Sequence, residues 1–423
     1  MYENIFRMVT GIFIGVWLAR FLGPSDYGQF NYIISFVTIF YPIYNLGTDD
    51  IIVKNLLETP LKAGKILGSA FCLRLLGSII SVSSISILGY FSIILNDKIS
   101  NNLFIYLILY SSFFSIKSFD VIYNWLQANF KESKAVLIRN ASFILVSLLK
   151  IYGITASKPW SFFIYIACLE IVFVSFFLIV YFVLNFKIKI LSFDMKLAKR
   201  IFSISRYIML IVFFEQGISK IDQIMVGNML GLEKLGIYTA ASKLISLWLF
   251  LPFSFAIGLY PLLIKSFTEN DLTTYAKYKN LLYGSVLWLA IIFTLLCSWL
   301  SDDIINILYG ERFLGAGKAL MILSWQVVFL FFTAVRNKVF IIEKKEKVSF
   351  LILSFTFVLN IPINYFFINK WGIYGASAAS LVAYCLGILL LFPFSNSVSK
   401  STVEIFRSLY IFPLVLKEYI KKI

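Results

Sequence analysis

The chain has 423 residues, of which 60% are apolar and 14% charged, and it carries a formal net charge of +16. Its mean hydropathy of +0.86 excludes an ordinary soluble domain and indicates an integral membrane protein. The absence of histidine excludes histidine-based acid–base catalysis, a Ser-His-Asp triad and most zinc chemistry. We attribute the positive charge to cytoplasmic loops beside anionic headgroups and not to binding of nucleic acid.

Twelve apolar segments are long enough to cross a bilayer as helices, which takes roughly 20 residues each. In chain order they lie near residues 5–22, 29–51, 66–95, 102–126, 135–156, 160–185, 201–229, 237–265, 280–301, 318–342, 347–369 and 373–396. We therefore predict an all-α integral membrane protein with about 12 transmembrane helices. The final stretch, residues 397–423, predicts an amphipathic helix at the cytoplasmic membrane interface, because five apolar residues form one stripe: Ile405, Leu409, Phe412, Leu416 and Tyr419.

Lysine and arginine are concentrated in every second gap between these segments. They gather around residues 54–65, 131–139, 187–206, 265–279 and 338–347 and again beyond residue 400, whereas the alternate gaps hold few. Because cytoplasmic loops carry the Lys/Arg excess, both termini should be cytoplasmic. The alternate gaps, including residues 97–101 and 301–317, should then be periplasmic.

One motif occurs twice. Residues 22–30 and 230–238 both read Leu-Gly-x4-Gly-x-aromatic, so Gly23 corresponds to Gly231 and Gly28 to Gly236, each after an odd-numbered span. Pro42 and Pro252 then fall at matching depths in the next span and are candidates for kinks that help gating. Glycine-flanked turns recur in many helical bundles, but this spacing favours a duplicated six-helix unit.

The duplication divides the chain into three parts. We predict an N-terminal six-helix bundle over residues 1–190, a C-terminal six-helix bundle over residues 191–396, and a cytoplasmic or interfacial tail over residues 397–423. The basic stretch at residues 187–206 is the natural linker between the bundles.

Ionisable side chains at membrane depth are costly and usually line a cavity or pair with one another. The cations suit phosphate oxygens and are predicted to bind an anionic diphosphate or sugar: Arg74, Lys117, Lys220, Lys243 and Arg336. Of these, Arg74 is the strongest candidate because it lies in mid-span. Lys243 and Arg336 could instead extend to the membrane interface. Several tyrosines could meet sugar faces, although an aromatic belt at the interface explains any single one more simply: Tyr41, Tyr44, Tyr106, Tyr110 and Tyr123.

The carboxylates suggest coupling to an ion. Asp222, Glu215 and Glu170 are candidates for binding H⁺ or Na⁺. Asp222 could alternatively pair with a cation and hold the cavity together. Asp49, which closes the second span, and Asp120 are candidates for a structural or gating role. Asp120 follows Lys117 by three residues, so the two share a helix face and could form an ion pair.

Four segments in chain order resemble one family. Residues 17–28 (Trp-Leu-Ala-Arg-Phe-Leu-Gly-Pro-Ser-Asp-Tyr-Gly) are similar to the first-loop signature of polysaccharide flippases. Residues 219–227, 235–243 and 371–378 resemble span 7 of those proteins and the beginnings of their spans 8 and 12. Together they resemble the O-antigen (Wzx-type) flippases, within the superfamily that includes MATE multidrug exporters and lipid II flippases. One difference is that Met1 almost adjoins the first span.

The resemblance implies a MATE-like transporter of two six-helix bundles, without a cofactor or enzymatic activity. It would move an undecaprenyl-diphosphate-linked oligosaccharide across the bacterial inner membrane by ion-coupled alternating access, for O-antigen or capsule synthesis. Membrane lipids, a polysaccharide polymerase and a chain-length regulator are the expected partners. Two alternatives remain. A MATE-like drug or metabolite antiporter would require a more acidic interior, and a membrane-embedded polymerase or ligase would require a larger periplasmic segment.

Overall fold

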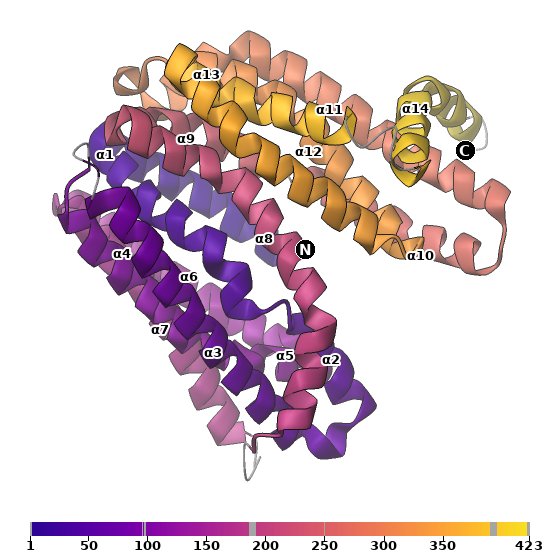
Figure 1. Cartoon of the computed structure of the whole chain (residues 1–423), viewed down its shortest axis with the longest axis horizontal. Coiled ribbons are helices and arrows are strands. Elements are labelled where there is room, and N and C mark those ends of the chain that lie inside the picture. Colours follow the sequence, from indigo (N-terminus) through magenta and orange to yellow (C-terminus); the bar gives the residue numbers. More distant parts are fainter. Residues whose placement is uncertain are drawn as a thin grey trace. The chain divides into compact units, whose positions relative to one another are not determined.

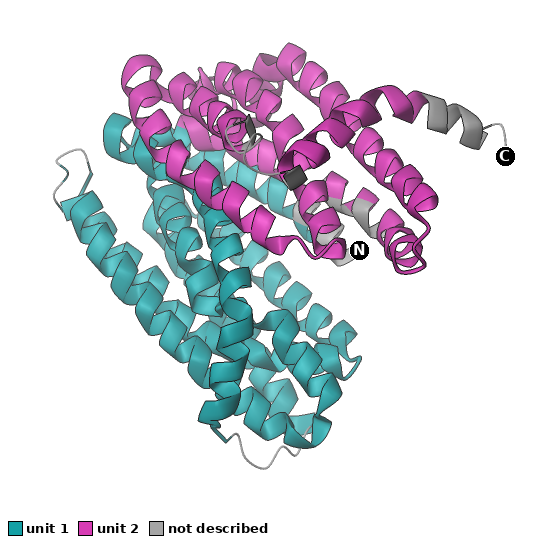
Figure 2. Cartoon of the chain, turned by 45° about the vertical axis from the view of Figure 1, so that its right-hand side comes forward, with its two compact units in different colours: residues 1–236 teal, residues 237–423 magenta. Residues whose placement is uncertain are grey.

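The computed structural model describes residues 2–94, 96, 99–185, 192–248, 250–389 and 396–420, which form helices and short connections without a β-strand (Figure 1). The chain divides into two compact units, residues 1–236 and 237–423 (Figure 2). The predicted boundary after residue 190 falls within residues 186–191, outside the described residues. The residue limits of the two bundles therefore stay a prediction.

The first unit contains eight α-helices and three short helical segments within the described chain. They are α1 (Tyr2–Asn45), α2 (Asp49–Glu58), η1 (Pro60–Lys62), α3 (Ala63–Gly89), η2 (Tyr90–Ile94), α4 (Asn102–Ser112), η3 (Phe113–Asp120), α5 (Val121–Ala128), α6 (Glu132–Thr155), α7 (Trp160–Asn185) and α8 (Met195–Leu230). Helix α9 (Leu232–Leu247) crosses the boundary between the units. The second unit continues with α10 (Phe250–Thr268), α11 (Leu272–Tyr309), η4 (Glu311–Phe313), α12 (Ala316–Ile342), α13 (Glu346–Leu389) and α14 (Asn396–Ile420).

Helices cover all twelve predicted spans over the described residues. Seven helical stretches of that part of the chain are long and apolar enough to cross a membrane. The first two spans form the single element α1, which bends at Gly23 (φ 72°), and the last two form α13, which bends at Gly372 (φ 62°). Glycine adopts positive φ without steric cost, so each pair of spans can change direction within one or two residues.

The two copies of the Leu-Gly-x4-Gly motif pack against each other. Gly23 and Gly231 have similar backbone angles, φ 72° and ψ 173° against φ 93° and ψ 168°. Gly28 packs on the backbone carbonyl of Leu232, and Gly236 packs in the same way on the carbonyl of Pro24. Leu232 is the counterpart of Pro24 in the repeat, so the contact is reciprocal. This symmetry supports the predicted duplication.

The predicted prolines have different settings. Pro42 lies inside α1, close to its end, and its carbonyl accepts a hydrogen bond from the Leu46 amide at 2.8 Å. Pro252 lies in the first turn of α10 and not in mid-helix, since the predicted eighth span is divided between α9 and α10. A proline in a first turn removes no intrahelical hydrogen bond, so Pro252 causes no kink in α10.

The C-terminal tail forms helix α14, as expected, but its apolar stripe packs inward over the described side chains. Ile405 is buried, Phe412 abuts Gly284 of α11, and Trp288 Nε1 donates to the Leu409 carbonyl at 3.2 Å. The described part of the stripe predicted to face the membrane therefore covers α11. A membrane-interface position for the tail as a whole stays a prediction.

Candidate functional site

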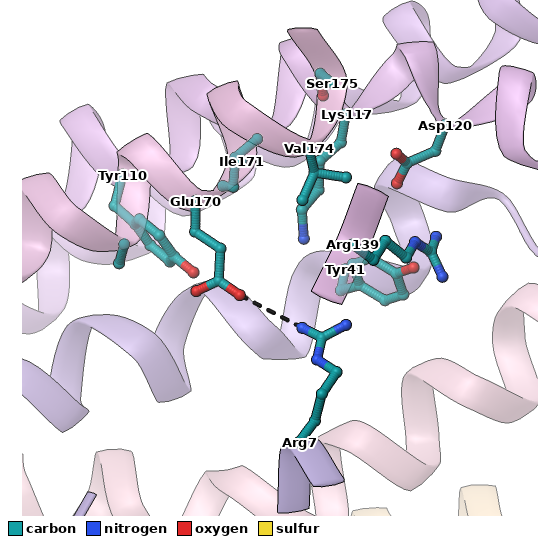
Figure 3. A pocket seen from close by; sticks show the side chains of 11 residues that line it. Arg7, Tyr41, Tyr110, Lys117, Asp120, Arg139, Glu170, Ile171, Val174 and Ser175 are labelled. Atoms are coloured by element: carbon teal, nitrogen blue, oxygen red, sulfur yellow. Dashed lines mark hydrogen bonds and ion pairs between the residues drawn. The ribbon is translucent and has the colours of Figure 1, made fainter. Parts of the chain in front are cut away.

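A polar cavity of about 310 Å³ lies within the first unit. Helices α1, α4, α6 and α7 and the segment η3 supply its lining: Arg7, Tyr41, Tyr110, Lys117, Asp120, Arg139, Ala167, Glu170, Ile171, Val174 and Ser175 (Figure 3). Five of these side chains are ionisable as Arg, Lys, Asp or Glu, which is costly at membrane depth and therefore marks a functional-site candidate.

The cations outnumber the carboxylates in this cavity. Arg7, Lys117 and Arg139 face Asp120 and Glu170. Arg7 Nη2 and Glu170 Oε1 are 3.5 Å apart, which joins α1 to α7 across the cavity (Figure 3). In a medium of low dielectric constant, an excess of positive charge attracts an anion strongly.

Lys117 comes from η3, a 3-10 segment that interrupts the fourth predicted span. Its ammonium nitrogen lies 5.3 Å from the ring centre of Tyr41 and 5.1 Å from that of Phe114. The predicted ion pair between Lys117 and Asp120 does not form, because the ammonium group lies over these two rings and Asp120 lies apart (Figure 3). A 3-10 segment inside a long helix often marks a functional hinge. The Tyr44 hydroxyl anchors it by donating to the Lys117 carbonyl at 2.6 Å.

Arg139 is the third cation of the cavity. Its guanidinium carbon lies 3.7 Å from the ring centre of Tyr123, whose hydroxyl donates to Glu132 at 2.7 Å. The sequence places Arg7 and Arg139 among the loop charges that set topology, so it did not predict them as site residues. Both arginines lie near the ends of predicted spans, and this position could have indicated a site. The same position is equally typical of charges at the membrane interface.

Arg74 lies outside the lining of this cavity. Its side chain is fully buried and donates through Nη2 to Asp49 at 2.6 Å and through Nε to Thr48 at 3.2 Å. Asn45 and Asn124 also donate to Asp49, at 2.7 and 3.0 Å. Asp49 thus forms an ion pair with Arg74, which the sequence analysis did not predict. A contact between Arg74 and the cargo stays a prediction.

The remaining candidates lie on other elements. On α8, Glu215 is exposed, Lys220 is half-buried, and Asp222 is buried and accepts from the Gln223 amide at 2.7 Å. Lys243 is half-buried on α9, and Arg336 is fully buried on α12. The cavity thus brings together Lys117, Asp120 and Glu170 of the predicted residues. Of the five predicted tyrosines, Tyr41 and Tyr110 line it.

Sequence comparison identifies the family. The model of the family described as "Polysaccharide biosynthesis protein" matches residues 2–267, more than half of the chain. The chain belongs to the polysaccharide biosynthesis protein family. The MatE family model also matches residues 208–366. A curated relative, an uncharacterized membrane protein of Methanocaldococcus jannaschii, is 25% identical over 195 residues. That match covers 45% of this chain and 38% of the relative, well under half of its length.

Solved structures agree with this family in fold. An inward-facing multidrug resistance MATE transporter has a TM-score of 0.73 at 14% identity, covering 94% of this chain and 95% of the other. The lipid II flippase MurJ, in an inward closed conformation, has a TM-score of 0.66 at 17% identity, covering 98% and 92%. The predicted all-α, MATE-like transporter fold of a multi-pass membrane protein is confirmed. These matched structures are a transporter and a flippase, not enzymes, as the sequence predicts.

Proposed function

We propose that the protein is a flippase that moves an undecaprenyl-diphosphate-linked oligosaccharide across a bacterial inner membrane for O-antigen or capsule synthesis. The observation that carries the proposal is the cation excess of the cavity in the first unit. Arg7, Lys117 and Arg139 face two carboxylates there. A diphosphate is the anionic part of such a cargo, and its oxygens are good acceptors for guanidinium and ammonium groups.

The position of Lys117 supports this assignment. Its charge lies over two aromatic rings, and no carboxylate of the described residues is at ion-pair distance from it. Cation–π contacts are weaker than a charge-assisted hydrogen bond to phosphate. Replacing the ring contacts of Lys117 by a hydrogen bond to a phosphoryl oxygen would therefore be favourable. Lys117 is therefore the residue that we assign to first contact with the diphosphate.

Arg7 would respond to the same charge. Its 3.5 Å separation from Glu170 is long for a charge-assisted hydrogen bond, which typically spans 2.7–2.9 Å. A diphosphate in the cavity would compete with Glu170 for the Arg7 guanidinium. Glu170 would then be left without its cation, which favours its protonation or Na⁺ binding and so links cargo binding to the coupling ion.

The volume limits what the cavity holds. About 310 Å³ is at the lower end of the range of small-molecule sites, roughly 300 to 1,000 Å³. It accommodates a diphosphate and the adjoining part of a sugar, and the rings of Tyr41 and Tyr110 line it as apolar surfaces for that sugar. The rest of the glycan and the polyprenyl chain would lie elsewhere.

The remaining parts of the proposal follow from the charge distribution and the resemblance. Both termini would be cytoplasmic, and the motion would be alternating access between the two bundles. Membrane lipids, a polysaccharide polymerase and a chain-length regulator would be its partners. The decisive test is reconstitution into proteoliposomes with a fluorescent undecaprenyl-diphosphate oligosaccharide, scored by its accessibility on each leaflet, together with complementation of a flippase-null strain.

A second candidate function is a cation antiporter of the MATE type. Asp120 and Glu170 favour it, since carboxylates inside a cavity bind organic cations. Efflux of a fluorescent cation from cells that express the protein, without rescue of surface polysaccharide, would support this function over the flippase.

A further inference from the structure

A buried guanidinium that has no carboxylate partner among the described residues lies in the C-terminal half of α12. Arg336 is 0% exposed, and its Nε, Nη1 and Nη2 atoms have no hydrogen-bond partner among the described residues. The rings of Phe332 and Phe340 flank it, with centres 4.8 and 5.8 Å from the guanidinium carbon. Aromatic faces attract a cation but supply no hydrogen-bond acceptor in the guanidinium plane.

Two hydroxyl groups near Arg336 are also buried without a hydrogen-bond partner among the described residues. Thr333 lies one helical turn before it on the same face of α12, and its Oγ1 is buried without a hydrogen-bond partner. Tyr283 of α11 interacts electrostatically with Arg336, and its Oη is also buried without a hydrogen-bond partner. The guanidinium and the two hydroxyls all have N–H or O–H donors to offer. Together these three side chains form a donor cluster.

The acidic groups near this cluster are already engaged. Glu343 accepts from Lys345 at 2.6 Å and lies 3.6 Å from Lys279. Glu404 of α14 lies 2.8 Å from the same Lys279. Both carboxylates thus have ion-pair partners of their own. A buried charge is tolerated when it is paired, and no carboxylate of the described residues pairs with Arg336, which leaves room for a counterion from solution.

We propose that Arg336, Tyr283 and Thr333 form a binding site for a small inorganic anion, chloride under ordinary salt conditions. The guanidinium and the two hydroxyls supply N–H and O–H donors without a hydrogen-bond partner among the described residues, which is what an anion requires. None of the three residues lines the proposed cargo cavity of the first unit, so the site is separate from it.

The test is the thermal stability of the purified protein in detergent, at constant ionic strength, with chloride exchanged against gluconate. Because a ligand that binds the folded state stabilises it by mass action, raising chloride from about 5 to about 300 mM should raise Tm by about 2 °C. Bromide should substitute and give an anomalous-scattering peak beside the guanidinium in crystals. Arg336→Met should abolish the chloride dependence, and Tyr283→Phe should weaken it while the fold is kept.

Three results would overturn the inference. The first is a wild-type Tm that does not depend on the halide. The second is stabilisation by inorganic diphosphate but not by chloride or bromide, which would assign Arg336 to the cargo. The third is an Arg336→Met variant with a higher Tm than the wild type at every chloride concentration, as expected for a buried charge that has no ligand. None of these experimental outcomes depends on whether the protein flips a lipid-linked glycan.

Discussion

Gly28 of α1 and Gly236 of α9 each lie where one copy of the motif crosses the backbone of the other, Gly28 on the carbonyl of Leu232 and Gly236 on that of Pro24. A methyl group at either position would overlap that carbonyl oxygen, and a backbone atom cannot move aside as a flexible side chain can. The reciprocal contact therefore requires glycine at both positions and joins the two repeats closely at this point.

We expect Gly28→Ala and Gly236→Ala each to lower the free energy of unfolding by about 2 kcal/mol, the usual cost of overpacking. Both substitutions should also reduce flipping, because the two copies of the motif can no longer pack closely against each other. Thermal unfolding in detergent and the proteoliposome assay measure these effects. Gly11→Ala is the matched control, because a Cβ there meets nothing within 4 Å. A Gly28→Ala variant as stable as Gly11→Ala would show that the contact is loose.

The charge of Lys117 is the basis of the proposed cargo site. Lys117→Met keeps the length of the side chain and removes the charge, so we expect cargo affinity to fall by about tenfold to a hundredfold, the value of one lost charge-assisted hydrogen bond. Lys117→Arg should retain partial function. Lys54→Met, at an exposed ion pair with Glu58 (3.8 Å), is the control. Equal flipping by Lys117→Met and the control would remove Lys117 from the site.

Variants of Arg74 and Asp49 can distinguish a structural role of Arg74 from a contact with the cargo. Removing its guanidinium leaves Asp49 without its cation, and we expect a loss of about 2 kcal/mol or more in Arg74→Ala. The loss should be smaller than for a fully buried pair, because half of the Asp49 side chain is exposed. The double variant Arg74→Met/Asp49→Asn removes both charges. Recovery of abundance and flipping in the double variant indicates a structural pair, whereas recovered abundance without flipping would indicate a contact with the cargo.

The membrane spans could be predicted from the sequence because hydropathy and span length follow directly from the thickness of the bilayer. The repeated motif could also be predicted from the sequence, because both copies place glycine at the same positions. Gly23 and Gly231 adopt the same unusual backbone conformation. The bend of α1 at Gly23 and the division of the eighth span near Pro252 depend on local backbone geometry that hydropathy does not encode.

The candidate site was only partly predictable. Lys117, Asp120 and Glu170 were identified because they are charged residues within spans. Arg7 and Arg139 were missed, because a charge at the end of a span looks the same whether it faces headgroups or turns into a cavity. The pairing of Arg74 with Asp49 spans 25 residues and two helices, and no spacing rule on a single helix predicts it.

Glu170 is now the first candidate for ion coupling, because it shares the cavity with the proposed cargo cations. We expect Glu170→Gln to bind cargo but to lose the response of flipping to an imposed pH or Na⁺ gradient, since a neutral amide cannot change its charge. Asp222→Asn tests the buried carboxylate of α8 in the same assay, and Glu233→Gln on α9 serves as the control. If Glu170→Gln responds to both gradients as the wild type does, coupling does not depend on this carboxylate.

One buried lysine adds an ion pair to the contacts between helix α14 and α11. Lys279 lies 2.8 Å from Glu404 of α14 and 3.6 Å from Glu343, which also accepts from Tyr275 at 3.1 Å. We expect Glu404→Gln to loosen α14, because Lys279 loses the nearer of its two carboxylates, and to increase cleavage in the tail by limited proteolysis. Glu269→Gln, in an exposed pair with Lys265 at 3.9 Å, is the matched control. Equal cleavage of the two variants would mean that the ion pair does not hold the helix.

The same attachment predicts a dependence on pH. Burial raises the pKa of Glu343, but the hydrogen bond from Lys345 and the charge of Lys279 outweigh it and hold the pKa below its usual value. A carboxyl whose pKa is lowered by folding contributes stability above its unfolded pKa of about 4.3 and loses it as the pH falls through the folded value. The tail should therefore stay protected through neutral pH and become protease-sensitive only below about pH 4. Glu343→Gln should remove this acid transition; a transition that persists unchanged in that variant would mean that Glu343 does not cause it.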